Sequence, residues 1–344
     1  MRLLEPFALG TLSVPNRVVM APMTRNRSPG GTVTPWAVEH YAARASAGLL
    51  ITESVNVSAR GQSTPDTPGL YTRAQAEAWR AVTDAVHHRD GRIVAQLAHA
   101  GRLTHSDYHG QVPVAPSALA PGGFIRTPKG TRTYEVPEVP DEAGVRTLVN
   151  EFAASARWAV DAGFDGVELH GAHGFLIDQF LQSRTNLRTD GYGGDRAGRR
   201  RFLIETVAAV AELWPWDRVG VTLSPGGNHK GIGDDDPRTT FTELVQALAG
   251  RVGWVHCADI PVADQRPSEW LKPAFRGPVI VSEGYTQEAA EEALAAGHAD
   301  LVAFGRAFTA NPDLVEKFRT GAPLAHADSR TFYTGGRDGY LDFP

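Results

Sequence analysis

The chain has 344 residues, 42% of them hydrophobic, and a net charge of -5, so it can bury a large core and gives no reason to expect a nucleic-acid partner. Its one cysteine, Cys257, excludes an internal disulfide and favours a reducing compartment. No apolar run approaches membrane-spanning length, and the opening Met-Arg-Leu-Leu-Glu-Pro is too short and too charged for a signal peptide. We therefore expect a cytoplasmic protein that does not enter a membrane.

Apolar, strand-like runs alternate with amphipathic segments of helical length. Eight runs are predicted to be strands: Val18–Ala21, Leu49–Glu53, Arg92–Leu97, Gly166–His170, Val219–Ser224, Trp254–Ala258, Pro278–Ser282 and Leu301–Gly305. Helices are predicted near 34–47, 72–89, 141–162, 195–214, 239–250, 268–275, 286–296 and 308–319. Eight such units favour parallel pairing in one closed (β/α)8 TIM barrel, an α/β fold that occupies residues 1–344 as a single domain.

A doubly wound sheet is the structural alternative. Its glycine-rich turn should follow the first strand, but the chain reads Pro22-Met23-Thr24-Arg25-Asn26 there, and the glycines at 191, 193 and 194 do not match the pattern either.

Two segments lie outside the repeating units. Residues 4–14, with Leu4, Phe7, Leu12 and Val14 between turns, predict a small N-terminal hairpin that plugs one end of the barrel. Residues 98–140 form a long excursion after the third strand, rich in glycine and proline, and loops of this length are usually functional. We interpret it as a lid over the substrate; it carries Tyr108 and Tyr134.

Two histidines, His170 and His173, lie at the end of the fourth strand with glycines between and after them. In a TIM barrel the loops after the strands form the catalytic face. Neutral imidazoles there can donate hydrogen bonds to a carbonyl oxygen. A metal site with Asp178 or the acidic run 234–236, and a purely structural role, are the alternatives, although neither acidic partner has a recognised metal-ligand spacing.

Other polar groups also fall at strand ends. Gly305 and Arg306 follow the eighth strand, where TIM barrels often bind phosphate; a surface salt bridge is the alternative for Arg306. Glu283, after the seventh strand, opposes that assignment unless it turns away or pairs with a cation. Thr24 and Gln96 could contact the edge of a planar heterocycle, or could be satisfied core groups. We interpret Cys257 as a buried small side chain and 234–236 as a solvated turn with a helix-capping aspartate.

Several motifs together resemble the old yellow enzyme family. They are Val18–Arg25, Gln96–Arg102, Glu168–Gly174, Asp178–Leu181, Asn186–Gly194, Ala303–Arg306, Asn311–Leu314 and the C-terminal Gly-Tyr-Leu-Asp-Phe-Pro. The resemblance implies a TIM barrel with non-covalently bound FMN, which takes hydride from NADH or NADPH and passes it to an activated alkene. It also implies that these proteins often form homodimers.

The resemblance further implies roles for individual residues. Thr24 would contact flavin O4, Gln96 the pyrimidine edge, and Arg306 the phosphate, while His170 and His173 would hold the substrate carbonyl. The remaining predicted cofactor contacts are Pro22, Met23, Ser54, Thr222, Gly284 and Gly305, and the predicted substrate contacts are Phe175, Tyr108 and Tyr134.

Four positions depart from the family pattern. Phe175 stands where the family has a proton-donating tyrosine, and Thr222 where it has an arginine near flavin N1. Glu283 replaces a glycine near the phosphate, and Ala98 replaces a frequent tryptophan. Losing a general acid typically costs 10²–10⁴-fold in rate.

We therefore expect an FMN-dependent oxidoreductase that acts on an enone-type alkene, with a proton from solvent or from Tyr108 or Tyr134. The alternative is a redox-neutral isomerase, epimerase or cyclase that uses the histidine pair to polarise a carbonyl, with FMN structural or absent. A flavin-binding or inactive scaffold is a third possibility.

Overall fold

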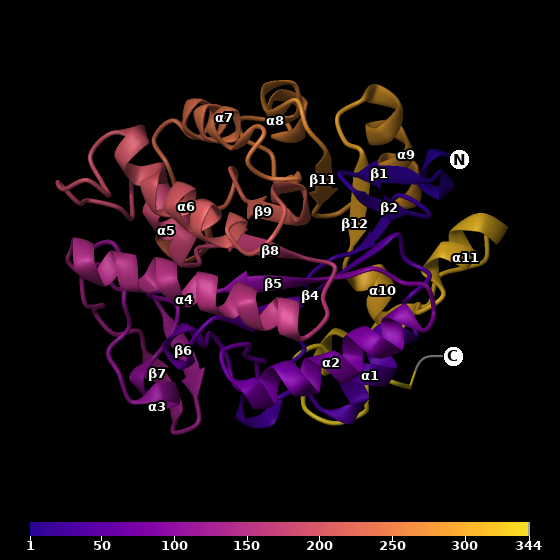
Figure 1. The fold of residues 1–344 in the computed structure, drawn as a ribbon, viewed down its shortest axis with the longest axis horizontal. Helices are drawn as coiled ribbons and strands as arrows, with labels where there is room; N and C mark the ends of the chain where they lie inside the picture. The colour runs from indigo at the N-terminus through magenta and orange to yellow at the C-terminus, as the bar shows by residue number, and fades with distance from the viewer. Residues whose placement is uncertain (343–344) are drawn as a thin grey trace.

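A computed structural model of the chain describes residues 1–342. Its centre is a closed, parallel, eight-stranded barrel in the order β3, β4, β5, β8, β9, β10, β11 and β12, which confirms the predicted TIM barrel (Figure 1). The strands are β3 (Val18–Met20), β4 (Leu49–Asn56), β5 (Ile93–Ala98), β8 (Gly166–Gly171), β9 (Val219–Leu223), β10 (Trp254–Ala258), β11 (Val279–Ser282) and β12 (Leu301–Phe304). Phe343 and Pro344, which end the C-terminal motif, lie outside the described residues.

Helices form the outer layer. They are α1 (Pro35–Ala42), α2 (Arg73–His87), α4 (Glu142–Asp161), α5 (Leu176–Leu181), α6 (Arg196–Ala211), α7 (Pro237–Leu248), α8 (Ser268–Phe275), α9 (Gln287–Ala296), α10 (Arg306–Ala310) and α11 (Leu314–Thr320). The last predicted helix, 308–319, is thus two helices, because Asn311 and Pro312 interrupt it. Asp236 caps α7 by accepting a hydrogen bond from the Thr239 N–H, as predicted for the acidic run.

Short 3-10 segments complete the connections. They are η1 (Arg2–Leu4), η2 (Pro29–Gly31), η3 (Ala59–Gly61), η4 (Trp216–Arg218), η5 (His229–Gly231) and η6 (Ser329–Thr331).

The N-terminal hairpin plugs the barrel end that lies opposite the catalytic face. Its strands are β1 (Phe7–Leu9) and β2 (Leu12–Val14), paired antiparallel. Leu9, Leu12 and Val14 are buried in one cluster with barrel side chains, among them Val94 and Ile280. The hairpin therefore closes the N-terminal end of the barrel, and the opposite end remains for a ligand.

The excursion after β5 is ordered rather than a plain loop. It contains α3 (Ser106–His109) and an antiparallel hairpin of β6 (Phe124–Thr127) and β7 (Gly130–Thr133), which lie together at one side of the barrel (Figure 1). Hydrogen bonds hold it to the barrel: Arg102 donates to the carbonyls of Leu119 and Lys230, so the excursion is attached to the loop that follows β9.

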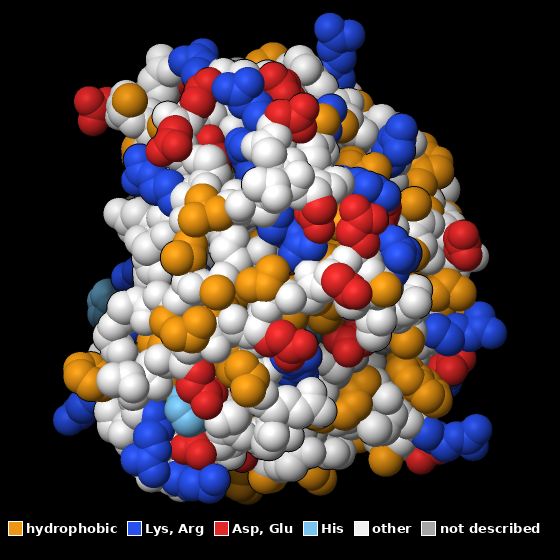
Figure 2. Space-filling model, turned by 90° about the vertical axis from the view of Figure 1, so that its left-hand side faces the viewer, with side chains coloured by type: hydrophobic (Ala, Val, Ile, Leu, Met, Phe, Trp, Pro, Cys, Tyr) orange, Lys and Arg blue, Asp and Glu red, His pale blue; other side chains and the backbone are white. Residues whose placement is uncertain are grey.

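One face of the molecule carries acidic, basic and apolar side chains interspersed (Figure 2). No helix in residues 1–342 is long and apolar enough to cross a membrane.

Candidate active site

The strand register places three candidate residues on the inner face of the barrel at one level. His170 on β8 is paired with Thr222 on β9, and Thr222 is paired with His256 on β10. Paired residues of neighbouring strands point to the same face of a sheet. The three side chains therefore share the inner face at the C-terminal end of the barrel, where TIM-barrel active sites lie.

The two predicted catalytic histidines lie together at this mouth. Their ring centroids are 5.6 Å apart. His173 has a φ of 56°, in the left-handed region, and the Gly174 that follows also has a positive φ. This tight turn, fixed by a 2.9 Å hydrogen bond from the His173 N–H to Ser224 Oγ, brings the second imidazole back over the first.

His170 is a neutral imidazole. Burial, followed by the nearby charge of His173, lowers the pKa of His170 to about 3. Its Nδ1 atom is buried and has no hydrogen-bond partner in the described residues. A neutral imidazole can donate a hydrogen bond to a substrate oxygen without contributing a formal charge.

Phe175 packs against the first histidine of the pair. Its ring meets that of His170 edge-on, with centroids 4.5 Å apart. Phenylalanine at this position has no proton to donate.

A buried carboxylate, Glu168, forms the floor below the pair, and sequence reasoning did not single it out. It is fully buried and accepts hydrogen bonds from Gln96 Nε2 (3.0 Å), Thr222 Oγ1 and Trp254 Nε1 (2.8 Å). His256 Nδ1 lies 3.2 Å from the same carboxylate. Although burial alone would raise the pKa of Glu168, the charge of His256 and these hydrogen bonds lower it to about 2. The floor therefore carries a buried negative charge.

Gln96 and Ser54 meet because of an irregularity in β4. The register between β4 and β5 shifts between Ile51 and Ser54, which inserts one extra residue into β4. After the shift Ser54 pairs with Gln96, and its hydroxyl donates to Gln96 Oε1 at 2.9 Å. Two predicted cofactor contacts are thus adjacent in the same layer as Glu168.

Glu283 pairs with His173 across the mouth. Their side chains lie 3.5 Å apart and are 44% and 39% exposed. The hydrogen bond from His173 lowers the pKa of Glu283, and the nearby Arg306 contributes in the same direction. Glu283 also has a φ of 79°, an unfavourable conformation for a side chain with a Cβ. The sequence allowed for a partner at Glu283, and the side chain that it meets is His173.

The predicted phosphate-binding residues lie at the ends of β11 and β12. Gly284 has a positive φ with open space around it, and Arg306 is exposed and makes no ion pair within residues 1–342. Gly305 lies beside Met23: a Cβ at 305 would come 3.0 Å from the methionine sulfur. This contact joins the β12 end to the loop after β3, which also holds Pro22 and Thr24, all partly exposed.

The C-terminal tail holds the loop after β3. Arg25 and Arg27 donate hydrogen bonds to tail carbonyls, including Phe332 and Asp338. Tyr340 is buried and stacks on His40 with ring centroids 4.0 Å apart. The tail therefore fixes the segment that immediately follows Thr24.

The two tyrosines of the excursion after β5 contact other parts of the chain. The Tyr108 hydroxyl donates to the Arg126 carbonyl, and burial raises its pKa to about 12. Lys230 Nζ lies 5.1 Å from the centre of the Tyr134 ring. Neither hydroxyl is hydrogen-bonded to His170 or His173 in the part of the chain that is described.

Asp178, considered as a metal ligand, has protein partners instead. It accepts hydrogen bonds from the Gly174 N–H and from Gln182 Nε2. Among residues 1–342, no group of three or more His, Cys, Asp or Glu side chains is arranged to hold a metal ion. Cys257 is buried, as predicted.

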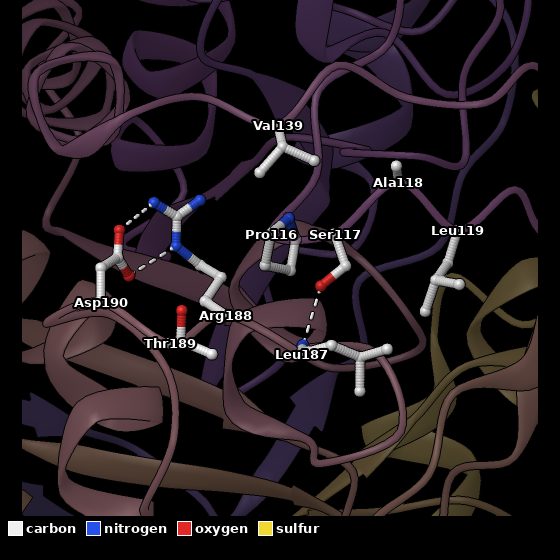
Figure 3. Close-up of a pocket in the computed structure, with 9 residues that line it drawn as sticks. All are labelled: Pro116, Ser117, Ala118, Leu119, Val139, Leu187, Arg188, Thr189 and Asp190. Carbon is white, nitrogen blue, oxygen red and sulfur yellow. Dashed lines mark hydrogen bonds and ion pairs between the residues drawn. The ribbon is translucent and has the colours of Figure 1, made fainter.

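A separate hollow of about 500 Å³ lies between the excursion after β5 and the loop after α5 (Figure 3). It is lined by Pro116, Ser117, Ala118, Leu119, Val139, Leu187, Arg188, Thr189 and Asp190. The Arg188–Asp190 ion pair and the Ser117 hydrogen bond to Leu187 N–H satisfy its polar groups. None of the predicted site residues lines it, so the candidate active site is the barrel mouth.

Comparison with known proteins gives the class to which the barrel and its polar mouth belong, the flavin-dependent TIM-barrel oxidoreductases. The pattern of the NADH:flavin oxidoreductase / NADH oxidase family matches residues 2–325. The chain therefore belongs to this family, that of the old yellow enzymes; it is an oxidoreductase of the ene-reductase type with FMN as cofactor.

Relatives support the assignment over the whole chain. A putative 12-oxophytodienoate reductase 4 of Oryza sativa subsp. japonica is 39% identical, covering 99% of this chain and 92% of the rice protein. The 12-oxophytodienoate reductase 2 of Arabidopsis thaliana is 38% identical, and the match covers 99% of this chain and 95% of the Arabidopsis protein.

Solved structures agree closely with the fold. Morphinone reductase in complex with tetrahydroNAD is 40% identical with a TM-score of 0.96, covering 100% of this chain and 97% of that one. The old yellow enzyme homologue from Zymomonas mobilis is 37% identical with a TM-score of 0.97, covering 100% and 99%.

Proposed function

We propose that this protein reduces the activated carbon–carbon double bond of an enone-type substrate, with NADH or NADPH as the source of hydride. One observation carries the proposal: a buried, neutral His170 and an accessible His173 converge at the mouth of a barrel that belongs to an FMN-dependent family. Such a pair can hold a carbonyl oxygen and stabilise the negative charge that develops on it when hydride arrives at the β-carbon.

The residues at the mouth fit FMN. The buried nitrogens His170 Nδ1 and His256 Nε2 lack partners within residues 1–342, which is unfavourable unless a bound molecule or water satisfies them. Arg306 is exposed and forms no ion pair with any residue from 1 to 342, and a Cβ at Gly284 would meet open space. Thr24, Gln96, Ser54, Pro22 and Met23 would hold the isoalloxazine, and Arg306, Gly284 and Gly305 the phosphate. Bound FMN would supply hydride transfer between the nicotinamide and the alkene.

The proton for the α-carbon must come from a group other than Phe175. Tyr108 is a poor donor because its hydroxyl is bound to Arg126 and its pKa is raised to about 12. His173 is 39% exposed, so the mouth is open to water. Burial also raises the pKa of Tyr134, which makes it a weaker acid. We therefore infer that water protonates the α-carbon.

The visible spectrum of purified protein, recorded before and after anaerobic NADH or NADPH, tests this function. We expect a yellow protein that bleaches, and the faster of the two coenzymes identifies the preferred one. A His170→Ala variant should still bleach but lose enone reduction. A protein that stays colourless when FMN is supplied would refute the oxidoreductase function.

A further inference from the structure

His256 is a buried histidine with only one of its two nitrogens engaged. Its side chain is 1% exposed, Nδ1 lies 3.2 Å from Glu168 Oε1, and Nε2 has no partner within residues 1–342. A buried nitrogen without a partner is costly, and natural proteins rarely leave one unless a ligand or water completes it. The free nitrogen thus indicates a role beyond packing.

The register places this nitrogen at the ligand-binding end of the barrel. His256 is level with Thr222, and Thr222 is level with His170. His256 is also close enough to Glu283 and His170 to influence the titration of both. The imidazole therefore lies within the floor of the mouth, between β9 and β11.

The position of His256 matters because Thr222, its neighbour across the sheet, carries no positive charge. Two-electron reduction of flavin at neutral pH leaves a negative charge on its pyrimidine ring, and nearby protein charges change the reduction potential of the flavin. Thr222 has a hydroxyl, which it donates to Glu168, and it offers no positive charge. Glu168 would itself oppose a negative flavin, because an uncompensated buried carboxylate repels a second anion.

The Glu168 carboxylate lies 3.2 Å from Nδ1 of His256 and fixes the orientation of this imidazole. Trp254, Thr222 and Gln96 donate to the same carboxylate, so its orientation is fixed from three strands. An imidazole that donates through Nδ1 and carries a second proton on Nε2 has one donor left for a ligand.

We propose that His256, positioned by Glu168, donates its Nε2–H to the pyrimidine edge of FMN and compensates the negative charge of the reduced cofactor in this chain. Glu168 is a positioning residue in this arrangement. The inference rests on the proposed function only in requiring FMN at the mouth; it does not depend on the substrate or on the proton donor.

The test is the FMN reduction potential of the holoprotein, measured by dye-coupled reduction with dithionite in the absence of nicotinamide and alkene. The His256→Gln variant keeps hydrogen-bonding capacity without charge. In this variant the affinity for reduced FMN, relative to that for oxidised FMN, should fall at least tenfold. The reduction potential of bound FMN should therefore fall by at least about 30 mV, the value of a tenfold change for a two-electron couple. The matched control is Cys257→Ser. Cys257 lies on the same strand but belongs to the outer core cluster rather than to the inner face. This control should leave the reduction potential of FMN unchanged.

An unchanged potential in folded His256→Gln protein would overturn the inference. If that variant does not fold, histidine nitrogen NMR of the wild-type holoprotein decides: the Nε2 resonance of His256 should be that of a protonated nitrogen and should shift on flavin reduction. A resonance that stays constant would also overturn it. Wild-type protein that binds no FMN would refute the proposed function itself, together with this inference.

Discussion

The substitution Glu283→Gly should tighten FMN binding with little change in stability. Glu283 lies at the end of β11, near Arg306, which we assign to the FMN phosphate. A carboxylate there opposes a phosphate of about two negative charges. At contact distance in a water-exposed site, the repulsion between two unit charges is about 1 kcal/mol. Removing the Glu283 carboxylate should therefore strengthen FMN binding by about 1–2 kcal/mol, which lowers the Kd about 5–30-fold.

The stability terms for this change nearly cancel. The left-handed φ of 79° costs a residue with a Cβ about 1 kcal/mol, which glycine avoids. This gain is offset because glycine has more conformational freedom in the unfolded chain, which lowers the stability of the folded state by about 0.5–1 kcal/mol. The half-exposed pair with His173 contributes about 0–1 kcal/mol. The free energy of unfolding should therefore change by less than about 1 kcal/mol.

FMN titration monitored by quenching of flavin fluorescence gives Kd, and urea unfolding of the apoprotein gives the stability. The control is Glu283→Gln, which removes the charge but keeps the backbone strain. It should show most of the gain in affinity without the relief of strain. Equal or weaker FMN binding in both variants would refute the assignment of this corner of the mouth to the phosphate.

Three further predictions concern the histidine pair and the tail. Phe175→Tyr places a phenol beside His170, so alkene reduction should become faster, by up to 10²–10⁴-fold where proton transfer limits it, with flavin reduction unchanged; stopped-flow measurement of both half-reactions checks this, and an unaltered rate would mean that another acid already suffices. Because the pKa of His170 is about 3 in the folded state and near 6.5 when unfolded, its contribution to stability is present above pH 6.5 and is lost as the pH falls. Wild-type protein should therefore lose about 1.4 kcal/mol per pH unit relative to His170→Asn between pH 6.5 and 4.5, in urea unfolding at each pH, and parallel curves would contradict the assignment of a neutral imidazole. Tyr340→Ala should cost about 3–5 kcal/mol because it empties a buried site stacked on His40, whereas Tyr340→Phe should be nearly neutral; thermal or urea unfolding that did not distinguish the two would disprove the role of the stack.

The barrel could be predicted from sequence because the strand and helix periodicities are strong and regularly spaced. The plugging hairpin was predictable for the same reason, since its apolar residues alternate between turns. The internal structure of the excursion could not be predicted, because the β6–β7 hairpin is mostly exposed and carries little hydrophobic pattern. The break between α10 and α11 was missed although Pro312 signals it.

The histidine pair, Gln96 and Ser54 could be proposed from sequence because they follow or end predicted strands, where catalytic loops begin. Glu168 and His256 were missed because they lie within apolar strands, where a polar residue is easily taken for an isolated exception. A signal was present in the sequence, because Glu168 and His256 are polar residues at positions that point into the barrel. Only the strand register shows that the two side chains meet. The contact between His173 and Glu283 depends on two left-handed residues, which no local pattern predicts.

The reaction of the reduced enzyme with an enone tests the central claim most directly. Protein with FMN bound would be reduced anaerobically with one equivalent of dithionite and then mixed with 2-cyclohexenone. We predict that the flavin absorbance returns and that one equivalent of saturated ketone forms. Flavin that remains reduced, with the enone unchanged or merely isomerised, would contradict the assignment and favour a redox-neutral use of the histidine pair.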